Sequence, residues 1–331
     1  MGTPATPQTS LFTLAVPMPP RMETSLATTA MKCALKISNW EGYKYDRDVS
    51  DQIAEIHRAA KDSGRFNKRL LPLKDLAEIT KAIGQARRDH EFLTLPWGDD
   101  GYRVLPAATY MEHTNTMRLR ATEFQTAYSR LEARFEDLVN SQSRLGTMFN
   151  IEDYPGMRKD GEKFRFIFPN ELRDKFSFKT DVLPLGDASD FRVNISDDER
   201  ERIKRQLAES IQASLRAGSR ELWQRLYTVV SHMSTRMAEY NSAEEGSRPK
   251  LYKSMVTNIV DLVDVLPKLN IAGDTELDRM ANDVRKSLLV DTVELRKSDT
   301  LRCDTARAAA DIVERMAAYM GMPTTPQQVV S

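Results

Sequence analysis

A basic segment between His57 and His90 contains residue types that bind phosphate. It holds nine Lys or Arg residues against four Asp or Glu residues, whereas the whole chain balances 48 basic and 48 acidic residues. In its densest part, residues 63–69, a phenylalanine lies among Arg, Asn and Lys, and such a loop could contact phosphates and stack a base. A solvated helix-turn-helix face is the alternative interpretation. The candidate nucleic-acid-binding residues are Arg58, Lys61, Arg65, Phe66, Lys68, Arg69, Arg87 and Arg88.

Aromatic residues form a second candidate surface. Phe164, Phe166 and Phe168 alternate with other residues, so a strand would place all three on one face. This pattern is loosely similar to the aromatic strand of RNA-recognition sheets, although the glycines of that motif are absent. Packing against a helix is the alternative role for such a face. Together with Trp97, which lies in a loop rich in Pro and Gly, they are the candidate interaction residues.

The other chemistry-bearing residues match no familiar site pattern. No histidine belongs to an HExxH motif or lies beside a cysteine, and Cys33 and Cys303 are far apart, so the sequence predicts no metal site. GxxxxGK, GxGxxG and GxSxG motifs are absent, which argues against an ATPase, a dinucleotide enzyme and a serine hydrolase. We therefore expect no cofactor and no enzyme activity, although a site assembled in space stays open. The four histidines are His57, His90, His113 and His232.

Two long apolar repeats predict two long helices. In each, apolar residues recur at steps of three and four, which keeps one seam facing a partner helix. The second helix begins near Ser196, a predicted N-cap followed by acidic residues, and we expect the two helices to pair antiparallel. The first seam contains Met117, Ala121, Phe124, Tyr128, Leu131, Phe135 and Leu138, and the second contains Ile203, Leu207, Ile211, Leu215, Leu222, Leu226, Val229, Met233 and Met237.

Shorter elements surround these helices. Alternating residues predict three strands at about 164–168, 176–182 and 191–195, and another at 33–37. The three strands would lie at the tip of the helical hairpin or fold back and accept the strand at 33–37. A further helix is predicted from about 73 to 92.

The expected fold is mainly α with a small antiparallel β insert, with a long helical hairpin or coiled-coil arm followed by C-terminal helices. A composition of 40% hydrophobic residues, 29% charged residues and only 14 glycines favours helix. The predicted order is a disordered tail (1–30), an N-terminal strand with helices and a Pro-Trp loop (31–106), the first long helix (107–153), the β insert (154–195), the second long helix (196–245), C-terminal helices (250–320) and a tail (321–331).

The charge balance and the apolar runs limit the classes of partner. With zero net charge, no global field attracts nucleic acid or an anionic membrane, so such binding would need a local patch. No apolar run approaches the ~18 residues that span a bilayer, and two cysteines suit a reducing compartment. We expect a cytoplasmic protein without a membrane partner.

Four short segments have distinctive sequences: Ile37-Ser38-Asn39-Trp40-Glu41-Gly42, Thr94-Leu95-Pro96-Trp97, Asp190-Phe191-Arg192-Val193 and Leu222-Trp223-Gln224-Arg225-Leu226-Tyr227. Together they resemble a family of uncharacterised helical proteins from tailed bacteriophages and mobile elements. The resemblance would cover about residues 35–289. Such proteins can be encoded near an AAA-type ATPase and a von Willebrand-type adhesion-domain protein, which implies an accessory or adaptor role, with an AAA-type ATPase as a partner and the bacterial host cytoplasm as the location. It transfers no catalytic residue.

Two functions are therefore expected. The first is a non-enzymatic phage or mobile-element accessory protein that binds a macromolecular partner, or self-assembles, through its helical arm and β tip. The second is a DNA-binding protein of phage replication or recombination that binds or anneals single strands through the basic segment and the phenylalanine strands. A salt-dependent interaction with single-stranded DNA would separate them.

Overall fold

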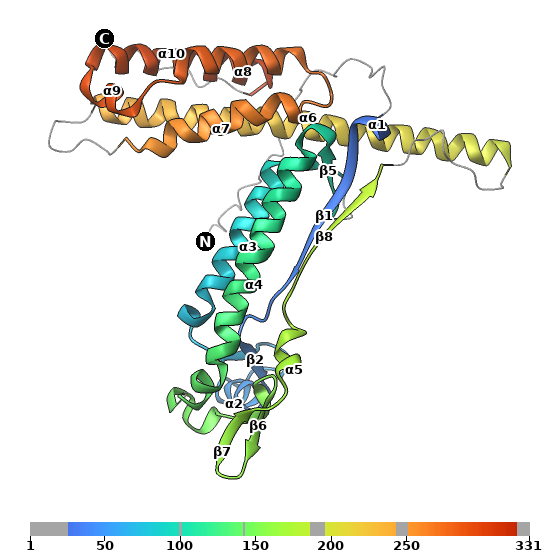
Figure 1. The fold of residues 1–331 in the computed structure, drawn as a ribbon, viewed down its shortest axis with the longest axis vertical. Coiled ribbons are helices and arrows are strands. Elements are labelled where there is room, and N and C mark those ends of the chain that lie inside the picture. Colours follow the sequence, from blue (N-terminus) through green and yellow to red (C-terminus); the bar gives the residue numbers. More distant parts are fainter. Residues whose placement is uncertain (1–25, 99–100, 142, 186–195, 243–250, 323–331) are drawn as a thin grey trace, which may run out of the picture. The chain divides into compact units, whose positions relative to one another are not determined.

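The computed structural model describes residues 26–98, 101–141, 143–185, 196–242 and 251–322 (Figure 1). These residues form two compact units. Unit one falls within residues 1–32, 93–110 and 183–331, and unit two comprises residues 33–92 and 111–182. Among the described residues, no helix combines the length and the apolar character needed to cross a membrane.

A helical hairpin forms the body of unit two. Its helices α3 (Leu73–Phe92) and α4 (Tyr110–Asn140) lie side by side (Figure 1). Three ion pairs fix their antiparallel direction, because positions early in α3 meet positions late in α4. The pairs are Asp89–Arg120 (2.6 Å), Glu78–Arg130 (2.9 Å) and Asp75–Arg134 (3.5 Å).

This hairpin confirms one prediction and corrects another. The helix expected at 73–92 is present, and most of the first predicted seam is buried along α4. The partner of α4 is α3, however, and not the second long helix, so the predicted pairing of the two long helices is wrong. α4 also ends at Asn140, and two 3-10 turns, η2 (Ser143–Met148) and η3 (Ile151–Asp153), follow it.

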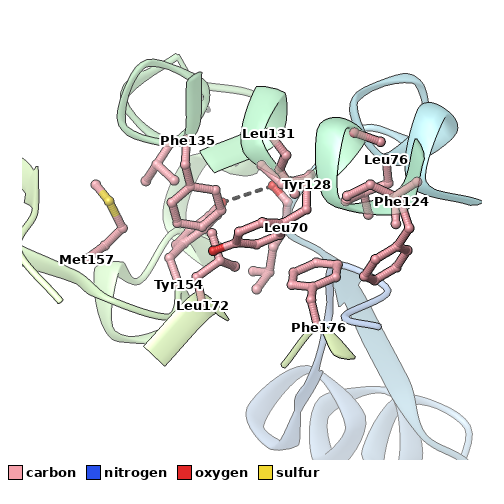
Figure 2. Packing of buried hydrophobic residues seen from close by; sticks show 14 of the residues in the cluster. Leu70, Leu76, Phe124, Tyr128, Leu131, Phe135, Tyr154, Met157, Leu172 and Phe176 are labelled. Carbon is pink, nitrogen blue, oxygen red and sulfur yellow. Dashed lines mark hydrogen bonds between the residues drawn. The ribbon is translucent and has the colours of Figure 1, made fainter. Parts of the chain in front are cut away.

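The core of unit two is rich in aromatic rings. Phe176 lies 5.1 Å from Tyr128 and 6.5 Å from Phe124, measured between ring centroids (Figure 2). The fully buried Tyr154 donates its hydroxyl hydrogen to the carbonyl of Leu70, at 3.1 Å. The α4 seam therefore packs against residues that precede α3 in the sequence, such as Leu70, and against residues that follow α4, such as Phe176. These contacts explain why the seam faces the core.

Small strand pairs complete unit two. β2 (Tyr43–Asp46) pairs antiparallel with β3 (Phe66–Arg69), and α2 (Arg47–Ile56) connects them after an N-cap by Asp46. β6 (Met157–Asp160) pairs antiparallel with β7 (Lys163–Phe166), before α5 (Pro169–Arg173). The pair β2–β3 and strand β6 were absent from the sequence predictions.

A four-stranded sheet has the order β4-β5-β1-β8. β1 (Ala30–Ser38) confirms the strand expected at 33–37, and β8 (Ser177–Pro184) lies beside it. One predicted insert strand therefore folds back onto β1, whereas β7 pairs with β6 in a separate ladder. β4 (Leu95–Pro96) and β5 (Arg103–Pro106) form the hairpin of the Pro-Trp loop. The strand predicted at 191–195 lies outside the described residues.

Helices dominate unit one. Most of the second seam is buried from Leu215 to Met237, where α6 packs against α7, α8 and α10, but Val230 is buried there in place of the predicted Val229. The earlier seam positions are only partly buried. Part of the predicted tail is ordered as well, because Leu26 and Ala30 are buried at α1 and the start of β1. The helices are α1 (Leu26–Thr29), η1 (Ala107–Thr109), α6 (Asp197–Ser242), α7 (Lys253–Leu269), α8 (Thr275–Leu288), α9 (Thr292–Lys297) and α10 (Asp299–Tyr319).

A buried carboxylate joins three of these helices. Asp274 caps α8 by accepting hydrogen bonds from the backbone N–H groups of Glu276 and Leu277, both at 3.1 Å. Its other oxygen accepts a hydrogen bond from the Trp223 indole of α6 at 2.9 Å, and that indole stacks on Tyr319 of α10 with centroids 4.5 Å apart. The carboxylate is therefore satisfied by structural partners.

Candidate nucleic-acid interface

The β2–β3 ladder of unit two sorts its side chains onto two faces. Tyr43 pairs with Arg69, and Tyr45 pairs with Asn67. Successive side chains on a strand point to opposite sides, so these four residues share one face of the ladder. Arg65, immediately before β3, lies 5.7 Å from the Tyr45 ring centroid. We call these five residues the Tyr-Arg face.

The aromatic rings of the Tyr-Arg face reach solvent. Tyr43 is 41% exposed and Tyr45 is 43% exposed. The Arg69 guanidinium lies 4.0 Å from the Tyr43 ring centroid and also donates a hydrogen bond to its hydroxyl. Two exposed rings, each with a cationic guanidinium over or near it, therefore lie together on a surface of unit two.

A tight turn before β2 places this ladder against the hairpin. The Gly42 carbonyl accepts a hydrogen bond from the Leu70 N–H at 2.8 Å, just beyond the end of β3. Gly42 has φ +68°, and a Cβ there would approach a Leu76 methyl carbon to 3.0 Å. Glycine supplies this left-handed backbone without strain. Leu70 and Leu71 are fully buried beside it, so the ladder continues directly into the core.

A hollow of about 340 Å³ shares Arg65 with the Tyr-Arg face, but its Phe66 belongs to the opposite face of the ladder. Its apolar wall includes Ile53, Ala54 and Phe66, and the exposed His57 lies at its edge. The Ser50 hydroxyl helps to shape it, accepting a hydrogen bond from the Phe66 N–H at 2.9 Å and donating one to the Asp46 carbonyl at 2.6 Å. The hollow offers an apolar wall and a cation within one site.

Lys68 belongs to the opposite face of β3 and is buried. Its ammonium lies 2.9 Å from an Asp46 oxygen, 2.8 Å from an Asp153 oxygen and 3.1 Å from the Met148 carbonyl. Burial acts to lower the pKa of Lys68, but the hydrogen bonds to Asp153 and Asp46 outweigh it and hold the pKa above its usual value. The assignment of Lys68 to phosphate binding is therefore wrong, because two carboxylates already neutralise it.

The other predicted basic residues separate into two groups. Arg58 and Lys61 are exposed near the hollow, and Lys61 forms a 3.8 Å ion pair with Asp51. Arg87 and Arg88 are exposed on α3. Arg87 lies roughly 21 Å along the helix axis from Leu73, the first residue of α3. The basic segment is therefore not one continuous patch.

The predicted interaction aromatics lie mostly in cores. Trp97 is buried in unit one, with the Lys32 ammonium 5.9 Å from its ring centroid. Phe164 and Phe166 pack against the core of unit two. Phe168 is 48% exposed, with the Arg158 guanidinium 5.0 Å from its ring centroid. Of these four residues, only Phe168 presents a largely open ring.

The structure also brings together three potential metal ligands in unit two that the sequence analysis left unassigned. Cys33 of β1, His90 in the last turn of α3 and His113 in the first turn of α4 are buried, and their ligand atoms lie within 4.8 Å of one another. His90 Nδ1 and His113 Nε2 are 2.9 Å apart, while His113 Nδ1 has no hydrogen-bond partner within the described chain. Burial lowers the pKa of His113 to about 4. Wide sequence separations left no motif by which to find them.

Tyr43 and Tyr45 were missed for a different reason. An alternating Tyr-Lys-Tyr-Asp segment is a readable strand signal, but its partner strand lies beyond a helix, where a basic loop was expected. Without the pairing, the tyrosines could not be placed beside Arg65 and Arg69.

Comparisons of this chain with protein-family models, with curated proteins and with solved structures find no match.

Proposed function

We propose that this protein binds single-stranded nucleic acid through the Tyr-Arg face. The observation that carries the proposal is the pairing of two exposed tyrosine rings with two arginines on one side of the β2–β3 ladder. Aromatic rings stack on bases of any sequence, and guanidinium groups attract phosphates and stack as well.

The spacing of the rings favours a single strand over a duplex. Side chains two residues apart on one strand are separated by about 6.8 Å. Stacked bases in a duplex repeat at about 3.4 Å along each strand and are covered by their neighbours. An extended single strand exposes its base faces and can match the wider repeat.

This proposal is one of the two functions expected from the sequence. The other, binding of a protein partner or self-assembly through the helical arm, relied on the apolar seams of the two long helices. Much of both seams is buried inside their own units, which supports giving nucleic acid first place. A role beside an AAA-type ATPase in a phage or mobile element remains a proposal that rests on resemblance alone.

The test is fluorescence anisotropy of labelled oligodeoxythymidylate and oligouridylate titrated with the full chain at several salt concentrations. We expect affinity to fall with salt, and Arg65→Ala with Arg69→Ala to reduce the salt slope by about 1.4, or roughly 0.7 for each lost phosphate contact. Arg87→Ala with Arg88→Ala is the matched control, because it removes the same charge from a distant part of α3. Equal losses in both double variants would show a nonspecific charge effect.

Tyrosine substitutions separate stacking from charge. Tyr45→Ala should weaken binding about 5- to 100-fold, the effect of losing one stacked base, whereas Tyr45→Phe should retain most of the affinity. Circular dichroism would check that each variant remains folded. The proposal fails if the wild-type chain binds neither oligonucleotide at low salt, where electrostatic attraction is strongest.

A further inference from the structure

We propose that Cys33, His90 and His113 form a Zn²⁺ site that fastens β1 to the ends of α3 and α4 within unit two. This inference is independent of the Tyr-Arg face. One thiol and two imidazoles are the donor types that Zn²⁺ prefers, whereas Mg²⁺ and Ca²⁺ require oxygen ligands.

The observed spacing suits such an ion. Zn²⁺ binds sulfur at about 2.3 Å and imidazole nitrogen at about 2.0–2.1 Å with tetrahedral geometry, so its ligand atoms lie roughly 3.3–3.6 Å from one another. The two imidazole nitrogens that face each other are 2.9 Å apart, and all three ligand atoms lie within 4.8 Å. The nitrogen–nitrogen separation is shorter than an ion requires and 4.8 Å is an upper limit for the three ligand atoms, so side-chain rotations that separate the two rings would have to admit the ion.

Packing alone accounts poorly for this cluster. His113 has no exposed surface, yet its Nδ1 makes no hydrogen bond within the described chain. Buried polar atoms of folded proteins are nearly always paired, and coordination of an ion by Nδ1, in place of the facing Nε2, would supply the partner that this nitrogen lacks.

The site would serve a structural role. Its three protein ligands come from three separate elements, and all are buried, so an ion would link segments that lie far apart in the sequence. On binding, the Cys33 thiol would release its proton to solvent as the metal–thiolate bond forms, while both imidazoles bind as neutral groups.

The primary test uses the full, reduced and metal-stripped chain titrated with Co²⁺, which takes the coordination of Zn²⁺ and absorbs light. We expect one equivalent to bind with a thiolate-to-cobalt charge-transfer band and tetrahedral d–d bands, and Zn²⁺ to displace it. Zn²⁺ at 100 times its Kd should also raise Tm by about 5 °C. Absence of the charge-transfer band in the wild-type chain would overturn the proposal whatever the variants do.

Variants assign the ligands. Cys33→Ser should abolish the charge-transfer band, and His113→Asn should weaken Co²⁺ binding at least roughly tenfold, as loss of an ordering or ligating partner does elsewhere. Cys303→Ser and His57→Asn are the matched controls, because they remove the other cysteine and an exposed histidine. A band that persists in Cys33→Ser but disappears in Cys303→Ser would place the ion elsewhere and reject this site.

Discussion

The two units bury polar groups in different ways. In unit one, Asp274 caps its own helix and receives two of its hydrogen bonds from residues two and three positions ahead. In unit two, Lys68 of β3 lies between Asp46, from the partner strand, and Asp153, from a 3-10 turn beyond α4. The two capping bonds of Asp274 follow from local helix chemistry, although its bond to Trp223 is tertiary, whereas both ion pairs of Lys68 exist only after tertiary folding.

The apolar cores differ in a parallel way. Unit two relies on rings such as Phe124, Tyr128 and Phe176, whose pairs are held at specific angles. Unit one relies mainly on aliphatic and methionine side chains, for example Leu226 and Met233 along α6. Aromatic pairs impose geometry, whereas methionine adapts to irregular gaps. We therefore expect unit two to tolerate core substitution less well.

The largest expected loss of stability comes from core substitutions, which test this difference between the two cores. Phe135→Ala in unit two removes a fully buried ring that contacts Trp40 and Phe166, and should lower the free energy of unfolding by about 3–5 kcal/mol. Met233→Ala in unit one should cost about 2–5 kcal/mol, toward the lower end. Urea unfolding gives the magnitude, and peptide-resolved hydrogen exchange shows which unit opens.

Arg130→Ala is the control for both, because Arg130 is exposed on α4 and its ion pair with the exposed Glu78 contributes little. If Phe135→Ala reduced protection from hydrogen exchange equally throughout the chain, the two units would unfold together. The tolerance of their two cores could then not be compared.

Removal of a buried cation should have the next largest effect. Lys68→Met leaves Asp46 and Asp153 facing each other in a poorly hydrated site, which should destabilise unit two by about 3 kcal/mol. Adding Asp46→Asn should restore part of this loss, since one of the uncompensated charges disappears. If the double variant were less stable than Lys68→Met, repulsion between the carboxylates could not be the cause. Chemical unfolding of the single and double variants measures the coupling.

The corresponding change in unit one should be smaller. Asp274→Ala removes a helix cap and leaves the Trp223 indole N–H without its acceptor, at a cost of about 2 kcal/mol. Asp291→Ala removes a cap from α9 whose bond to the Val293 N–H lies in an exposed position, and should cost only about 1 kcal/mol. A thermal melt compares the two. Equal shifts in Tm would mean that the bond to Trp223 adds nothing.

The sequence predicted what is local in both units. The helix at residues 73–92, most of the first apolar seam and the strand at 33–37 are confirmed, because each follows from periodicity within a few residues. The predicted partner of α4 was wrong, because a 3.5-residue seam indicates that a helix has a partner but does not identify that partner.

The candidate sites could be predicted only in part. Arg65 and Arg69 were found by charge, but their tyrosine neighbours depend on the pairing of β2 with β3 across α2. The Cys33, His90 and His113 cluster depends on the ends of a hairpin meeting a strand. Neither arrangement leaves a spacing motif, so no single-sequence rule could have assembled it.

The smallest expected effect is the pH dependence of the Lys68 cluster. The hydrogen bond to Lys68, followed by the one to the Val49 N–H, holds the pKa of Asp46 below its usual 3.8. Folding therefore favours the carboxylate, and its stabilising contribution is present above pH 3.8 and is lost as pH falls through the lower pKa of the folded state. The contribution of Lys68, whose pKa is above 10.5, is lost only at alkaline pH.

The pH dependence of the Lys68 cluster is easier to measure at acidic pH than at alkaline pH. At alkaline pH the loss would overlap that of Tyr128, whose pKa burial and the neighbouring Glu132 raise to about 12. Urea unfolding at pH 7 and at pH 3 should therefore show a smaller loss of stability in Asp46→Asn than in the wild type, because the amide cannot be protonated in this range. Asp48→Asn, which changes an exposed carboxyl two residues away, should lose as much stability between pH 7 and pH 3 as the wild type does. If both variants reduced the loss of stability between pH 7 and pH 3 equally, general charge repulsion rather than the buried Lys68 cluster would control the acid sensitivity of unit two.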